Sequence, residues 1–186
     1  GGPADDGVGV GDVAAAVKLN GSIGQINYGF LAATENDDVG RDFYALRATR
    51  ESDVHDFGGM LTHVNRPFLD RQASVLSFDH RYTPSAKWDV RTQFVGSNID
   101  QSGVTTRDSG AQMRIDHDLG ETGGWRQQLY ALHSGKGLQL NDIGYLDRNN
   151  FNYLRYEVNQ RVGTYPEDSR YAGSFWRYAA SMRYND

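Results

Sequence analysis

The sequence contains no cysteine, only four prolines and no long apolar run among its 186 residues. The absence of cysteine excludes a disulfide framework, a thiolate nucleophile and a thiolate metal site. No stretch approaches the roughly 18 consecutive apolar residues of a membrane-spanning helix. A membrane-spanning β-strand needs only about 9–11 residues of alternating character, so a strand-based membrane protein remains compatible with the sequence.

Lysine is also scarce, because only Lys18, Lys87 and Lys136 occur among the 19 basic residues and the others are arginine. Arginine pairs with carboxylates bidentately and suits partly enclosed ion-pair networks. The net charge of −5 provides no basic field for a nucleic-acid partner. Tyrosine and glycine are abundant, with 11 and 22 residues, while hydrophobic residues reach only 38%. This composition favours sheets with one polar face over a helical domain.

The stretch 73–97 shows the pattern that governs the rest of the chain. It consists of two runs that alternate between apolar and polar residues, joined by a turn that contains Pro84. A period of two is typical of a β-strand, and two such runs joined this tightly indicate an antiparallel hairpin. One face of the hairpin is apolar with an aromatic rim, and the other carries full charges of both signs.

Applied to the whole chain, this pattern predicts an all-β fold, an antiparallel up-and-down meander of about ten strands that forms a transmembrane β-barrel or a segment of a larger one. Residues 1–12 are predicted to be a flexible Gly-rich linker or loop, and residues 13–186 a β-barrel domain, which we expect to be a fragment of a longer chain. Polar loops are predicted at 98–106 and, as the longest irregular segment, at 135–150. The predicted strands cover residues 13–23, 25–34, 42–51, 57–65, 73–82, 87–97, 107–118, 125–134, 151–163 and 171–184.

Charged residues occupy the middle of one face in most of these strands. A wet, narrow lumen would hold such side chains as interstrand ion pairs, whereas an exposed soluble face would use more lysine. Two interpretations are compatible with each other: a structural ladder of ion pairs, and a selectivity lining for anionic or sugar-like solutes. The residues predicted to line the lumen are Arg47, Asp79, Arg81, Asp89, Arg91, Arg114, Asp116, Arg155, Glu157, Arg161, Arg177 and Arg183.

The opposite face is predicted to contact the lipid bilayer of a bacterial outer membrane. Tyrosine and tryptophan near strand ends would form the interfacial girdles of such a barrel, and other outer-membrane or periplasmic proteins or saccharides are further candidate partners. The residues predicted to face lipid are Leu76, Phe78, Val90, Phe94, Met113, Ile115, Tyr156, Val158, Trp176 and Tyr178. The function this predicts is a pore or scaffold, non-enzymatic, linked to the passage or docking of a saccharide or polymer.

Two other classes of protein are compatible with alternating strands. A soluble lipocalin-like carrier would have its apolar face inside and its charged face outside. A hydrolase on the barrel wall would need serine and histidine on adjacent strands with a third polar group, which His133 and Ser134 do not offer, since sequence neighbours point to opposite faces. No cofactor and no metal site is expected, because no histidine pair has the spacing of a helical zinc site and the acidic segment 35–40 lacks the spacing of a calcium loop.

Three segments carry a resemblance to a known family. They are VKLNGSIGQINYGFLAATEN at 17–36, FYALRATRES at 43–52 and GLQLNDIGYLDRNNFNY at 137–153. With them the chain resembles, over most of residues 13–184, the barrel region of the DUF5916 family of large bacterial outer-membrane proteins. Members often carry a carbohydrate-binding family 9-like domain before the barrel, and this domain is absent from the sequence. The resemblance implies an outer-membrane barrel and brings no defined activity with it.

Overall fold

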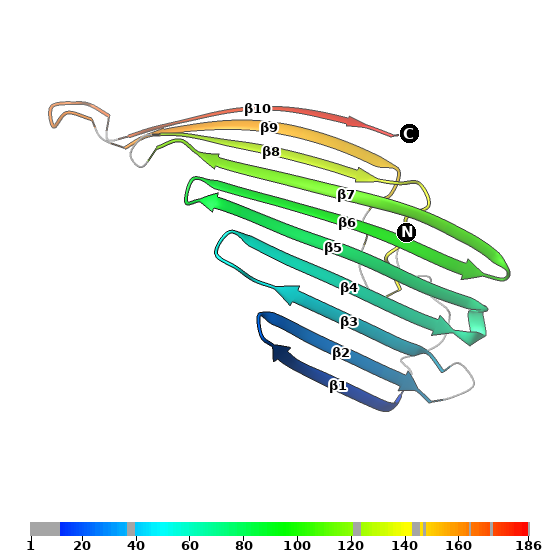
Figure 1. Cartoon of the computed structure of the whole chain (residues 1–186). Coiled ribbons are helices and arrows are strands. Elements are labelled where there is room, and N and C mark those ends of the chain that lie inside the picture. Colours follow the sequence, from blue (N-terminus) through cyan, green and yellow to red (C-terminus); the bar gives the residue numbers. More distant parts are fainter. Residues whose placement is uncertain are drawn as a thin grey trace.

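The computed structural model of the chain describes residues 12–36, 40–120, 124–142, 146, 148–163, 165–171 and 173–185. Residues 1–11 of the predicted linker lie outside this description. Within it, one antiparallel sheet accounts for nearly all regular structure, and each strand pairs with its sequence neighbours in the order β1 to β10 (Figure 1). The strands are β1 (Val13–Ile23), β2 (Ile26–Glu35), β3 (Asp42–Arg50), β4 (His55–Arg66), β5 (Arg71–Ser85), β6 (Trp88–Gln101), β7 (Val104–Asp118), β8 (Trp125–Ser134), β9 (Phe151–Val162) and β10 (Ser174–Tyr184).

The predicted meander of ten strands is therefore confirmed, with one loop placed wrongly. The segment 98–106 was predicted to be a polar loop, but β6 and β7 continue through it and leave only Ser102 and Gly103 between them. Both residues have a positive φ, 52° and 76°, which suits a two-residue hairpin turn of the I′ type. The segment was predicted to be a loop because Asn98 and Asp100 are polar. They alternate with the buried Ile99, as residues of a strand do. The last strand also begins later than predicted, so Tyr171 lies before β10.

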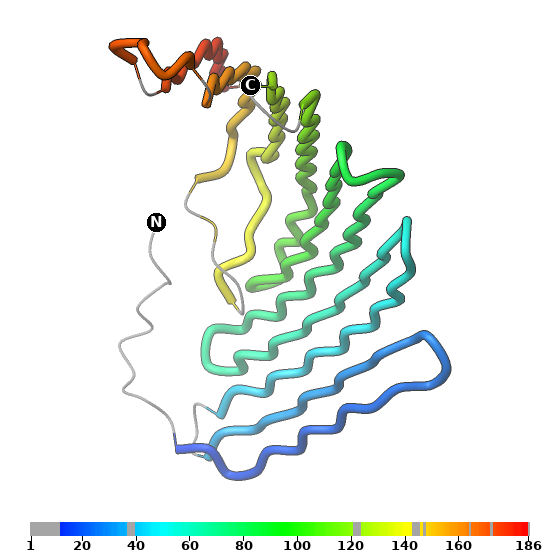
Figure 2. Tube along the Cα trace, turned by 90° about the vertical axis from the view of Figure 1, so that its left-hand side faces the viewer, coloured from blue at the N-terminus to red at the C-terminus, as the bar shows by residue number. Residues whose placement is uncertain are grey.

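The sheet is curved and open, with β1 and β10 as its two unjoined edges (Figure 2). It curves around the connection between β8 and β9, whose described residues 135–142, 146 and 148–150 lie on its hollow side (Figure 2). Barrel-like curvature is thus present among the described residues, whereas a closed barrel is not. No helix in the described part of the chain has the length and apolar character needed to span a membrane.

The buried core is small and lies on the concave side, near the end of the sheet that carries the turn at 102–103. Val64, Ala73 and Ile99 stand opposite one another on β4, β5 and β6, and together with Leu138 of the β8–β9 connection they are 1–2% exposed. Gly110 on β7 has no side chain at this point, and a Cβ there would lie 2.9 Å from Leu138 Cδ2. The connection therefore packs onto the sheet through apolar contacts that strand alternation alone does not predict.

Candidate functional site

The charged residues predicted to line a lumen all lie on one face of the sheet. Directly opposed residues share a face, and the strand registers bring Arg47, Asp79, Asp89 and Asp116 to the same side as the other eight. This side, here called the charged face, is the concave one, because the β8–β9 connection binds to Arg71 and Ser97 on it. The role of these residues as a lumen lining remains a prediction.

Ion pairs on the charged face follow a regular scheme in which two arginines share one carboxylate. Six arginines lie within ion-pair distance of three carboxylates in this way: Arg81 and Arg91 at Asp89, Arg114 and Arg126 at Asp116, and Arg155 and Arg177 at Glu157. Some pairs are interstrand, as predicted, for example Arg81 Nη2 to Asp89 Oδ2 at 2.7 Å. Others join residues two apart on one strand, such as Arg114 and Asp116. The ladder thus retains an excess of positive charge, although the whole chain is acidic.

The arginines and the carboxylates occupy neighbouring rungs of the sheet. Arg81, Arg91 and Arg114 stand directly opposite one another on β5, β6 and β7. The next rung towards the 86–87 turn holds Asp89 opposite Asp116. Like charges placed directly opposite destabilise a sheet, so the acidic rung offsets the repulsion within the arginine rung.

Asp116 is a buried carboxylate of this ladder with three side-chain partners. It is 8% exposed and also accepts a hydrogen bond of 2.8 Å from Gln128 Nε2. We expect Asp116→Ala to lower the free energy of unfolding in detergent by about 1–2 kcal/mol, because it leaves two arginines and an amide without their acceptor. Thermal or urea unfolding would measure the loss.

A double-mutant cycle gives this prediction its control. Asp116→Ala combined with Arg114→Ala should cost less than the sum of the two single changes, because the double variant leaves no unpaired partner in that pair. Additive effects would contradict the structural role of the ladder and would identify the pair as ordinary solvated surface.

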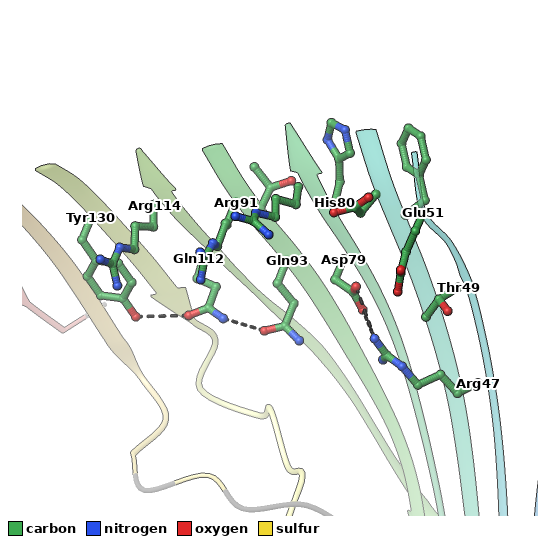
Figure 3. Close-up of a pocket in the computed structure, with 14 residues that line it drawn as sticks. Arg47, Thr49, Glu51, Asp79, His80, Arg91, Gln93, Gln112, Arg114 and Tyr130 are labelled. Carbon is green, nitrogen blue, oxygen red and sulfur yellow. Dashed lines mark hydrogen bonds and ion pairs between the residues drawn. The ribbon is translucent and has the colours of Figure 1, made fainter. Parts of the chain in front are cut away.

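A cavity of about 520 Å³ opens on the charged face next to the arginine rung (Figure 3). On its β6–β8 side, Tyr130 Oη donates to Gln112 Oε1 at 3.2 Å and Gln112 Nε2 donates to Gln93 Oε1 at 2.6 Å. Arg91 and Arg114 lie beside this chain of amides, and the acidic lining residues Glu51 and Asp79 lie across the cavity, with Arg47 next to Asp79 (Figure 3). The cavity therefore has a cationic, amide-bearing side and an acidic side.

Gly58 makes room for the ion pair on the acidic side of the cavity. Arg47 Nη2 on β3 lies 3.3 Å from Asp79 Oδ1 on β5, although β4 runs between these strands. Gly58 stands directly opposite Asp79, and a Cβ at this glycine would lie 2.7 Å from Asp79 Cγ. Gly58 is therefore a site of close packing between neighbouring strands.

Substitution of Gly58 should displace the carboxylate that covers it. We expect Gly58→Ala to cost about 1–2 kcal/mol of unfolding free energy, since the new methyl group forces Asp79 away from Arg47. Chemical denaturation measures the change. Gly59→Ala is the matched control, because its nearest non-neighbouring atom is a backbone oxygen at 3.9 Å; an equal loss in both variants would mean that glycine flexibility, and not the packing of Asp79, sets the cost.

The β8–β9 connection is held to the charged face by a buried ion pair. Asp142 accepts from Arg71 at 2.7 and 3.1 Å, and Arg66 Nε lies 3.4 Å from the same carboxylate. Backbone N–H groups of the connection also bind the sheet, with Gly137 donating to Asp108 Oδ2 at 2.7 Å. Sequence reasoning did not anticipate this contact, because Arg66 and Asp142 lie far apart in the chain and outside the alternating pattern.

The residues predicted to face lipid all lie on the opposite, convex side, here called the apolar face. Leu76, Phe78, Phe94, Tyr156, Trp176 and Tyr178 are 44–62% exposed on it, and Val90, Met113, Ile115 and Val158 are half-buried between them. Aromatic rings gather along the strand ends near the 86–87 turn, where Trp88 and His117 stack with their ring centroids 3.7 Å apart. This face is continuous from strand to strand, and its contact with lipid remains a prediction.

All five histidines lie on the apolar face, each with a partner. His55 Nδ1 and His80 Nε2 are 3.0 Å apart, His117 stacks on Trp88, and His133 Nδ1 lies 2.7 Å from Asn152 Oδ1. Ser134 lies on the charged face and is 2% exposed, so it points away from His133, as expected from strand alternation.

A different serine and histidine meet on adjacent strands. His63 Nδ1 lies 2.9 Å from Ser74 Oγ on the apolar face, a contact that sequence reasoning missed because the two residues belong to different strands. Among the described residues no carboxylate binds the other ring nitrogen of His63, so the orienting group of a hydrolytic triad is lacking there. The described part of the chain also contains no group of three or more histidine, aspartate or glutamate side chains arranged to hold a metal ion.

No protein-family model, curated protein or solved structure matches the chain. The interpretation of the two faces therefore rests on the residues and on their geometry.

Proposed function

We propose that this chain forms wall strands of an outer-membrane β-barrel and serves as a non-enzymatic pore or scaffold with a charged, arginine-rich interior. The single observation that carries the proposal is the division of the sheet into an exposed apolar convex face and a concave face of ion pairs. Lipid-facing strands of such barrels alternate in this way, with aromatic girdles outside and polar residues inside.

The extent of the apolar face supports this proposal. On β6 it runs from Trp88 to Gly96 and ends where Asn98 and Asp100 begin. These eight residue steps correspond to about 26 Å along the strand. A strand tilt of about 40° reduces this to roughly 20 Å of height, close to the apolar band of about 25 Å on outer-membrane barrels.

The soluble alternative, a lipocalin-like carrier, needs the reverse arrangement. Its apolar side chains would enclose a cavity and its charges would face water. Here the cavity beside Arg91 and Gln112 is lined mostly by charged and polar residues, and the large aromatic residues are exposed on the other side. The open edges at β1 and β10 are consistent with further strands from a longer chain, which would complete the barrel.

Partitioning between lipid and water tests the proposal. The chain is refolded in detergent, mixed with phosphatidylcholine vesicles, floated on a density gradient and washed with urea. We expect it to float with the vesicles and to resist the wash, because its apolar face needs lipid. A chain that stays monodisperse in detergent-free buffer and does not float would contradict the proposal and support the soluble carrier.

Conductance across a planar bilayer separates the two forms of the proposal. Stepwise currents with anion preference support a pore, because the ladder carries more arginine than carboxylate. Stable insertion without current supports a scaffold that docks saccharides, polymers or other envelope proteins.

A further inference from the structure

The cationic side of the cavity has the chemistry of a binding site for a sugar acid. We propose that Arg91, Arg114, Gln93 and Gln112 bind a saccharide that bears a carboxylate or phosphate group, with the anion on the arginines and the hydroxyls on the amides. This inference rests on the proposed function insofar as the cavity lies in the barrel interior, and it names the class of solute that the interior recognises.

The arginines retain donors that the ladder does not use. Arg91 and Arg114 bind their carboxylates through Nε and Nη2, and among the described residues neither Nη1 has a partner. Both side chains are about half exposed, at 55% and 43%, and both line the cavity. Because they stand directly opposite each other, an anion bound between them would relieve their mutual repulsion.

Uncharged donors and acceptors lie about one sugar ring away from this anion site. Gln93 follows Arg91 by two residues, and Gln112 precedes Arg114 by two residues. Two residues correspond to about 6.6 Å along a strand. That distance is comparable to the width of a pyranose ring. Gln93 Nε2 has no acceptor among the described residues, so the chain from Tyr130 through Gln112 ends in a donor that faces the cavity.

The position of the acidic lining residues gives the site its polarity. Asp79 is paired with Arg47, and it lies with Glu51 across the cavity from Arg114 (Figure 3). An anionic solute is therefore directed to the β6–β8 side. A neutral sugar would gain only the amide contacts, and inorganic phosphate only the guanidinium contacts.

Calorimetric titration of the full chain in detergent tests this inference. The probes are glucuronate, glucose 6-phosphate, glucose and inorganic phosphate. We expect glucuronate and glucose 6-phosphate to bind at least tenfold more tightly than glucose or phosphate, and 0.5 M salt to weaken them, since exposed charges are screened. Equal binding of phosphate and of the sugar acids would overturn the role of the amides, and no binding of either sugar acid would overturn the site.

Arg114→Gln and Arg177→Gln form a matched pair of variants. Each removes one of two arginines from a shared carboxylate and leaves the other in place, at Asp116 and Glu157 respectively, but only Arg114 lines the cavity. We expect about a tenfold loss of glucuronate affinity in Arg114→Gln and less than a twofold change in Arg177→Gln. Equal losses would overturn the site and assign binding to the general charge of the face.

A third variant keeps the test decisive if Arg114→Gln fails to fold. Gln93→Ala removes a side chain outside the ion-pair ladder and should weaken the sugar acids about fivefold while leaving phosphate unchanged; an unchanged sugar-acid affinity would contradict the inference. Because binding is measured in micelles, its failure is distinct from failure of the proposed function. If the chain inserts into vesicles but binds no sugar acid, only the binding site is contradicted. If it binds a sugar acid but does not insert, the membrane proposal is contradicted.

Discussion

Phe94→Arg will hinder insertion of the chain into lipid vesicles by about 2–4 kcal/mol if this residue lies at the bilayer midplane. Phe94 is 55% exposed on the apolar face, two residues from the centre of the apolar stretch of β6 and opposite Phe78 on the neighbouring strand. A guanidinium at this position would have to leave water for the hydrocarbon core without an ion-pair partner. The equilibrium between urea-unfolded and vesicle-inserted chain measures the cost.

The adjacent position on the same strand provides a control for this change. Gln93 lies at the same depth but on the charged face, directly opposite Asp79, so Gln93→Arg gains a carboxylate neighbour and should insert nearly as well as the parent. If Phe94→Arg inserts as stably as Gln93→Arg, the apolar face does not contact lipid.

Asp142→Ala should have the largest effect on folding stability, about 3 kcal/mol. The side chains of Asp142, Arg66 and Arg71 are only 7%, 11% and 14% exposed, and removal of one partner from a buried ion pair leaves an uncompensated charge. We expect the β8–β9 connection to detach from the charged face, with a lower free energy of unfolding in urea and rapid proteolysis near Lys136.

Asp118→Ala is the matched comparison for that loss. Asp118 is an exposed carboxylate at the end of β7. Within the described part of the chain it accepts only a backbone hydrogen bond from Gly120 at 3.2 Å, so its removal should change stability by less than about 0.5 kcal/mol. A similar small change in Asp142→Ala, with the connection still protected from protease, would contradict the account of how this segment is held.

Strand alternation predicted the sheet and the division of its faces because both depend on local sequence. Asp89 and Arg91 stand two apart on β6 and share a side whatever the rest of the chain does. The same pattern placed Phe94 and Val90 together on the other face. The register that places Arg91 opposite Arg114 was not predicted, because the segment 98–106 between these strands was expected to be a loop.

What could not be predicted depends on contacts between distant parts of the chain. Val64, Ala73 and Ile99 are apolar residues at positions of the charged face. They are buried there because the β8–β9 connection packs over them with Leu138. The pairing of Arg47 with Asp79 likewise depends on the absence of a side chain at Gly58. The cavity takes its lining from strands β3 to β8 together, a combination that no local pattern specifies.

The most direct test of the account is the alternation of lipid contact along β6. Because the chain has no cysteine, single cysteines can be placed at 90, 91, 92, 93 and 94, labelled with a fluorophore and exposed to brominated lipids in vesicles. The account predicts strong quenching at 90, 92 and 94 and weak quenching at 91 and 93, with the reverse pattern for a water-soluble quencher. Uniform quenching by water-soluble agents at all five positions, or stronger lipid quenching at 91 and 93, would contradict it.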